Sequence, residues 1–117
     1  MNSYVAPGLH LLVDFFDASN LQNIEFIEQT LRAAAYACNA NVLSVNLHSF
    51  GENHGVTGVA VLAESHITIH TWSETSYIAI DIFMCGSCNP HNAIAILEAA
   101  FKPGSSKISE HKRGVAL

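Results

Sequence analysis

Basic residues and long apolar runs are scarce in this chain of 117 residues, and both shortages limit what it can bind. It has 5 Lys and Arg against 10 Asp and Glu, which gives a formal net charge of -5. Surfaces that hold nucleic acid or anionic membranes are normally basic, so we expect neither partner. No run of about 18 apolar residues is present to cross a bilayer, and the first residues lack a basic segment followed by an apolar one. We therefore expect a cytoplasmic protein whose partner is a small molecule or another protein.

Cysteine is also sparse, with three residues at positions 38, 85 and 88. An odd number without the dense spacing of a disulfide framework predicts reduced thiols in a reducing compartment. Repeats, linkers and low-complexity segments are missing as well. Half of the residues are hydrophobic, which is enough for one core in a chain of this length. We expect a single domain over residues 1–117.

The spacing of apolar residues alternates between the strand period of two and the helical period. Strands are expected over 9–16, 42–50, 56–62, 63–72 and 77–85, with a last strand near 106–110. A first helix should start at a capping box formed by Ser19 and Gln22 and end near Asn39. A second should start at Asn89-Pro90, with proline at the first helical position. This order predicts an α+β two-layer sandwich, in which two helices cover the aliphatic face of one mainly antiparallel sheet.

The sheet face turned away from the helices has an unusual composition. Alternation over 42–50 places Leu43, Val45 and Leu47 on the helix-covered side. The expected members of the other face are Asn46, His48, Phe50, His66, Thr68, His70, Trp72, Tyr77, Asp81 and Cys85. This set is too aromatic to be simply solvated and too polar for an ordinary core. We expect it to form an active-site surface that a second copy partly covers in a layered dimer.

The segment 63–72 concentrates reactive side chains. The hydroxyl of Ser65 follows the carboxylate of Glu64, and the imidazole of His70 lies a few strand positions further along. Taken singly, His70 is an ordinary hydrogen-bonded core histidine and Glu74 an ordinary solvated turn residue. Their occurrence together within one strand and turn favours a reaction site.

Two other chemistries compete with this interpretation. Histidines at 48, 54, 66 and 70 suggest a metal site, but four strand residues separate the Cα atoms of His66 and His70 by about 13 Å. Without acidic ligands from elsewhere these two do not share an ion, and we expect no metal. Cys85 and Cys88 form a C-x-x-C between a strand and a helix, which is typical of thiol redox proteins. A thioredoxin-like fold places that motif after an early strand, whereas here five strand-like segments precede it.

Residues 64–74 and 77–86 strongly resemble the prokaryotic S-adenosylmethionine decarboxylases, and shorter matches at 55–58 and 110–114 extend the likeness over nearly the whole chain. The resemblance implies a self-processing, pyruvoyl-dependent decarboxylase that converts S-adenosylmethionine to the aminopropyl donor of spermidine synthesis. Ser73 and the Thr75-Ser76 pair depart from residues that are common in the family. A pyruvoyl-dependent decarboxylase of another amino acid, such as ornithine or arginine, is therefore the alternative.

The resemblance also implies how the precursor matures. The hydroxyl of Ser65 attacks the carbonyl of Glu64 and turns the peptide bond into an ester. His70 then takes the α-proton of Ser65, and the chain that ends at Glu64 is released. The residue that remains becomes a pyruvoyl group, the cofactor derived from Ser65. Thr57 offers a hydroxyl suited to supporting this reaction.

Three further roles follow from the same resemblance. Maturation divides the chain into residues 1–64 (beta chain) and 65–117 (alpha chain), and two processed protomers form a homodimer. Cys85 supplies the proton that completes decarboxylation. Phe50 stacks on the adenine of the substrate, and Glu74 accepts hydrogen bonds from the ribose hydroxyls.

Overall fold

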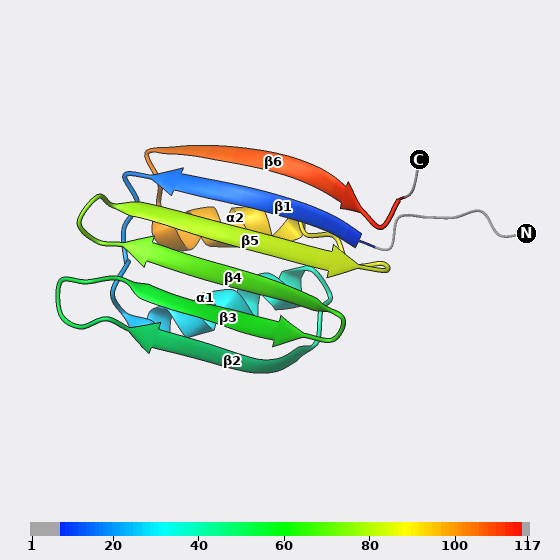
Figure 1. The fold of residues 1–117 in the computed structure, drawn as a ribbon, viewed down its shortest axis with the longest axis horizontal. Helices are drawn as coiled ribbons and strands as arrows, with labels where there is room; N and C mark the ends of the chain where they lie inside the picture. The colour runs from blue at the N-terminus through cyan, green and yellow to red at the C-terminus, as the bar shows by residue number, and fades with distance from the viewer. Residues whose placement is uncertain (1–7, 116–117) are drawn as a thin grey trace, which may run out of the picture.

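The computed structural model describes residues 8–115 and consists of one six-stranded sheet with both helices on the same face (Figure 1). In chain order the elements are Gly8–Phe16 (β1), Ile24–Ala37 (α1), Val42–Ser49 (β2), Val56–Leu62 (β3), Ser65–Trp72 (β4), Tyr77–Cys85 (β5), Asn92–Phe101 (α2) and Ser105–Arg113 (β6). The strand order is β2-β3-β4-β5-β1-β6, and every neighbouring pair is antiparallel. The predicted α+β sandwich is confirmed.

The core lies between the sheet and the helices because the central strands alternate strictly. Every second residue of β4 and β5 is buried against the helices, including Ile67, Ile69, Ile78, Ile80 and Ile82. Helix α1 meets them with the apolar stripe of Ile27, Leu31, Ala34 and Ala35. Burying these aliphatic side chains supplies the main driving force for folding, at roughly 25 cal/mol for each Å² removed from water. Within the described residues, neither helix is long and apolar enough to cross a membrane.

The start of α1 differs from the prediction. Asn23 is the N-cap, and its side-chain oxygen accepts a hydrogen bond from the backbone N–H of Phe26 at 3.0 Å. The predicted capping box of Ser19 and Gln22 is wrong, because Gln22 instead accepts a hydrogen bond from the backbone N–H of Asn53 at 3.1 Å. Asparagine is as good a cap as serine, so the local chemistry allowed either start.

The second helix and the last strand also differ in their bounds. Helix α2 begins at Asn92 with His91 as its N-cap, so Pro90 lies in the preceding turn and not at the first helical position. The strand β6 covers Ser105–Arg113 and pairs with β1 along its whole length, which is longer than the segment predicted from the sequence.

The edge strand β2 contains an irregularity that changes which side chains face the core. Its register with β3 shifts between Val42 and Ser44, which is the pattern of a β-bulge. The side chain of Leu43 is consequently 67% exposed, so its predicted place on the helix-covered side is wrong. Val45 and Leu47, beyond the bulge, pack against the core as expected.

The other face of the sheet is uncovered in the single chain and carries polar and aromatic side chains, as expected. An aromatic ladder runs across it, with the ring of Tyr77 stacked on Trp72 at 5.2 Å and on Phe16 at 5.6 Å. The phenol of Tyr77 donates a hydrogen bond to Asp14 at 2.5 Å. Strand β1 therefore adds His10, Asp14 and Phe16 to a surface that the sequence predicted only from the later strands.

Candidate active site

The residues expected at the cleavage site meet where β3 turns into β4 and β5 ends. The thiol of Cys85 donates a hydrogen bond to the backbone oxygen of Glu64 at 3.0 Å. The Ser65 hydroxyl lies 3.7 Å from the same sulfur and is only 9% exposed. A nucleophilic hydroxyl, the carbonyl that precedes it and a proton-bearing thiol therefore share one corner of the molecule.

The turn between β3 and β4 holds this carbonyl in a strained segment. Leu62 pairs with Ser65, so Ala63 and Glu64 form a two-residue hairpin turn. Glu64 has φ of 62°, in the left-handed region that glycine or asparagine normally occupies in such turns. For a residue with a Cβ this conformation costs roughly 1–2 kcal/mol. The strain lies at the residue whose peptide bond would be broken.

A second group of predicted residues lies at the opposite end of β4. Thr57 on β3 is the register partner of His70 on β4, and the hydroxyl of Thr57 lies 2.5 Å from Nδ1 of His70. Beside them is a cavity of about 380 Å³. It is lined by Phe50, His54, Gly55, Val56, Thr57, His70, Thr71, Trp72 and Glu74. Phe50 and Glu74 thus share one cavity with the Thr57–His70 pair.

The wall of this cavity is held by polar contacts of the β4–β5 turn. Ser73 donates a hydrogen bond to the backbone oxygen of His54 at 3.1 Å, and the imidazole of His54 lies 4.0 Å from the carboxylate of Glu74. At Gly55 an added Cβ would lie 1.7 Å from the backbone oxygen of Thr71, so only glycine fits there. Ser73 therefore ties the turn that carries Glu74 to the other side of the cavity.

The two groups do not meet within one chain. Ser65 belongs to the buried series of β4 that faces the helices, whereas His70 belongs to the exposed series on the other face. Five residues of extended strand also separate them, which is about 16 Å. Direct proton transfer from Ser65 to His70 is therefore impossible inside a single copy of this structure.

A second cavity, of about 460 Å³, adjoins Cys85. Its lining is Gly8, Leu9, Met84, Cys85, Gly86, Cys88, Asn89, His91, Glu110 and Lys112. His91 and Glu110 are paired across it at 2.6 Å. His91, Glu110 and Lys112 were missed as cavity residues because they reach the site from the N-cap of α2 and from β6, and no spacing within one segment indicated this.

All three cysteines are free thiols, and they have separate surroundings. Burial raises the pKa of the Cys38 thiol to about 11, and the nearby Cys88 adds to this shift. Cys88 donates a hydrogen bond to the backbone oxygen of Asn39 at 3.4 Å, whereas Cys85 faces Glu64. The two thiols of the C-x-x-C motif are thus engaged with different parts of the chain.

Several known proteins with similar sequences or structures are named as adenosylmethionine decarboxylases or their proenzymes. Residues 9–114 match the family model described as S-adenosylmethionine decarboxylase. A Methanococcus aeolicus protein named S-adenosylmethionine decarboxylase proenzyme is 44% identical over 110 residues, which cover 92% of this chain and 93% of that protein. A Thermomicrobium roseum protein of the same name is 35% identical over 111 residues, covering 94% and 96%. The crystal structure of the adenosylmethionine decarboxylase from Aquifex aeolicus superimposes with a TM-score of 0.85 at 30% identity, covering 96% of this chain and 94% of that chain.

Proposed function

This chain belongs to the S-adenosylmethionine decarboxylase family, and on that premise we propose that it is a self-processing precursor that releases carbon dioxide from S-adenosylmethionine. Its product would be the aminopropyl donor for spermidine synthesis. One observation supports this most directly: the Ser65 hydroxyl, the Glu64 carbonyl and the Cys85 thiol lie together at a strained turn. That set contains the nucleophile and the carbonyl needed for the first step toward a pyruvoyl cofactor, and a thiol that can protonate the product.

Maturation begins with the attack of the Ser65 hydroxyl on the carbonyl carbon of Glu64. The C–N bond breaks, an ester forms, and the released amine of Ser65 takes the hydroxyl proton. The strain of the left-handed turn favours loss of the planar amide. The thiol of Cys85 already donates to the carbonyl oxygen, which is where negative charge develops in the tetrahedral intermediate. Cys85 is thus placed to assist cleavage as well as decarboxylation.

The second step removes the α-proton of Ser65 and breaks the ester at the Ser65 Cβ–O bond. The leaving group is the new main-chain carboxylate of Glu64. The chain is thereby divided into residues 1–64 and 65–117. The dehydroalanine left at position 65 takes up water and loses ammonia, which gives the pyruvoyl group. His70 is the proposed base, and Thr57 is hydrogen-bonded to its imidazole and fixes its orientation.

A homodimer supplies the missing proximity between Ser65 and His70. The uncovered sheet face exposes Leu12, Phe16 and Trp72, each of which is more than one third accessible, and burying these side chains favours association. Cys85, whose sulfur lies 3.7 Å from the Ser65 hydroxyl, belongs to the partly exposed series of β5, so this end of β4 can be approached from the uncovered face. If two copies pack these faces together about a two-fold axis that runs across β4 near its middle, the Ser65 end of β4 in one copy would lie over the His70 end in the other. Each active site would then be composite.

The proposal extends to the parts of the substrate. The pyruvoyl group, once formed, supplies the carbonyl that accepts the electrons released with carbon dioxide. Cys85 holds the proton for the product beside that position. Phe50 and Glu74 bind the nucleoside in the cavity at the other end of the strand, which the partner copy contributes. Lys112 lines the cavity next to Cys85 and offers a positive charge to the amino-acid portion.

The test is the intact mass of the purified chain together with the release of labelled carbon dioxide. Wild-type protein should give two fragments divided between Glu64 and Ser65 and should decarboxylate S-adenosylmethionine. Ser65→Ala should stay as one chain of 12.6 kDa without activity, while Ser44→Ala on the edge strand should behave as wild type. An active Ser65→Ala variant would overturn the mechanism. Turnover of ornithine or arginine, with none of S-adenosylmethionine, would overturn the substrate.

A further inference from the structure

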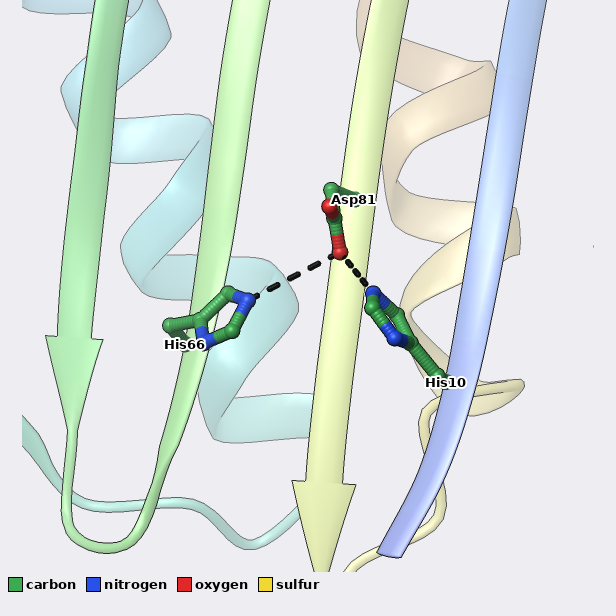
Figure 2. Close-up of side chains that lie close together, drawn as sticks. All are labelled: His10, His66 and Asp81. Atoms are coloured by element: carbon green, nitrogen blue, oxygen red, sulfur yellow. Dashed lines mark hydrogen bonds and ion pairs between the residues drawn. The ribbon is translucent and has the colours of Figure 1, made fainter. Parts of the chain in front are cut away.

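Three side chains outside the proposed catalytic set converge on the uncovered sheet face. Figure 2 shows His10, His66 and Asp81 pointing toward one another from β1, β4 and β5. An oxygen of Asp81 contacts Nε2 of His10 and lies 3.7 Å from Nε2 of His66. The three candidate ligand atoms all lie within 4.8 Å of one another.

We propose that this cluster is a binding site for a divalent transition-metal ion of the zinc type. Two imidazole nitrogens and one carboxylate oxygen are a common ligand set for such ions, and three protein ligands leave a fourth position open. Tetrahedral coordination with metal–ligand distances near 2.1 Å requires ligand atoms about 3.4 Å apart. Because the three ligand atoms already lie within 4.8 Å of one another, side-chain rotations that bring them closer would be enough to bind the ion.

The surroundings hold the two imidazoles in place. His10 and His66 are both opposite Phe83 of β5 in the strand register, and the Phe83 ring lies 5.5 Å from the first and 5.7 Å from the second. All three ligands therefore stand on neighbouring strands of a regular sheet, where the backbone is rigid. Such support lowers the cost of ordering ligands around an ion.

Arg113 is the group that opposes the ion. Its guanidinium donates to Nδ1 of His10 at 2.9 Å. In that arrangement the proton of the neutral imidazole must be on Nε2, where it is donated to Asp81. A metal ion needs the lone pair of Nε2, so the proton moves to Nδ1 and Arg113 must withdraw. The same withdrawal removes a positive charge from the neighbourhood of the ion.

Because Arg113 and the metal ion compete for His10, the effect of replacing Arg113 distinguishes this site from a scattered set of surface histidines. Replacing Arg113 should tighten metal binding, although Arg113 is not a ligand. Replacing a ligand should weaken it. The site uses none of the residues assigned above to cleavage, proton donation or nucleoside binding, so loss of metal binding and loss of activity are separate results. It lies on the face that the second copy covers in the proposed dimer, where its open fourth position would face the partner sheet.

The experiment titrates chelator-treated full chain with Zn²⁺ against a chromogenic indicator, and follows visible absorption with Co²⁺. One ion per chain is expected. Asp81→Asn, His10→Gln and His66→Gln should each weaken binding at least about tenfold. Arg113→Gln should tighten it several-fold, and His48→Gln, on the same face at the far edge, should leave it unchanged.

Several outcomes would overturn the site. They are the absence of stoichiometric binding, equal affinity in the ligand variants and wild type, and loss of binding in Cys88→Ser with thiolate bands in the Co²⁺ spectrum. Thermal unfolding followed by circular dichroism checks that each variant is folded. Arg113→Gln keeps every ligand, so it remains decisive if a ligand variant fails to fold: unchanged or weaker binding in that variant contradicts the proposal.

Discussion

At the scale of single residues, Cys85 connects the two proposed reactions. Its sulfur lies 3.0 Å from the carbonyl oxygen of Glu64 and 3.7 Å from the hydroxyl of Ser65. In the proposed mechanism, the first contact would serve cleavage of the precursor, and the second would place a proton beside the position where the product forms. Cys88, three residues later, has neither contact and is bonded to the backbone of Asn39.

This difference predicts opposite outcomes for the two thiols. Cys85→Ala should still mature, more slowly than wild type, because the strained turn and the Ser65 hydroxyl remain. Its decarboxylation rate should fall about 10²-fold or more, the usual contribution of a positioned proton donor. Cleavage is followed by gel and carbon dioxide release by label. Cys88→Ala is the matched control and should keep the wild-type rate, and equal losses in both variants would contradict the assignment.

Tyr77 gives a pH prediction. The hydrogen bond to Asp14, with burial as a second cause, raises the pKa of Tyr77 from 10.0 to about 12. The folded state therefore keeps this proton more strongly than the unfolded state. The resulting stabilisation is complete below about pH 10 and is lost as the pH rises toward 12.

Denaturant unfolding between pH 8 and pH 12 measures this effect. The wild-type free energy of unfolding should decline above pH 10, and Tyr77→Phe should show a shallower decline from a lower starting value. Tyr36→Phe is the control, because the side chain of Tyr36 is 83% exposed. Parallel pH profiles for wild type and Tyr77→Phe would contradict the raised pKa.

At the scale of elements, the start of α1 had two candidate N-caps in the sequence, Ser19 and Asn23, and the structure has Asn23 in that role. Asn23→Ala should lower the free energy of unfolding by about 1 kcal/mol, because the backbone N–H of Phe26 loses its acceptor. Ser19→Ala should cost much less, since within residues 8–115 the hydrogen bond of Ser19 runs from its backbone N–H to the backbone oxygen of Phe101. Chemical denaturation compares the two variants. A larger loss of unfolding free energy in Ser19→Ala than in Asn23→Ala would favour the predicted capping box over the Asn23 cap.

The local pattern of apolar residues was sufficient to predict most of the helices and strands. It was not sufficient to predict which distant strands pair, or in what register. The strict alternation around Ile67 and Ile80 fixed the central strands and the core face. The bulge that exposes Leu43 left no signal, since the sequence alternates through it. His10 was missed because it lies within an apolar run, and its partner Asp81 is 71 residues away. Only the pairing of β1 with β5 brings them together.

The turn between β3 and β4 yields a further prediction. Glu64→Gly removes the Cβ that makes the left-handed conformation costly, so the precursor should gain up to about 1 kcal/mol of stability. If turn strain promotes cleavage, the first-order rate of chain cleavage should fall in this variant. Glu64→Gln keeps the strained conformation and removes only the charge, so it should cleave faster than Glu64→Gly. The reverse order would show that the carboxylate of Glu64, and not the strain, drives cleavage.

At the scale of the whole molecule, the arrangement of chemistry favours an obligate pair of chains. The nucleophile and thiol lie at one end of β4, and the proposed base, its threonine partner and the nucleoside cavity lie at the other. Both helices lie on one side of the sheet, behind its inner strands, whereas the side that carries His70 is uncovered (Figure 1). In the dimer that we propose, a second copy would cover that face and complete both sites at once.

Complementation between two inactive variants tests this directly. Ser65→Ala lacks the nucleophile, and His70→Gln lacks the base, so neither should mature alone. In a mixed dimer, the Ser65 of the His70→Gln chain faces the His70 of the Ser65→Ala chain, and one of the two sites is intact. Random pairing of co-expressed chains makes half of the dimers mixed, so about one quarter of the wild-type sites should form. With the chains separately tagged, only the His70→Gln chain should be cleaved; if neither is cleaved in a proven mixed dimer, His70 acts within its own chain and the composite site is wrong.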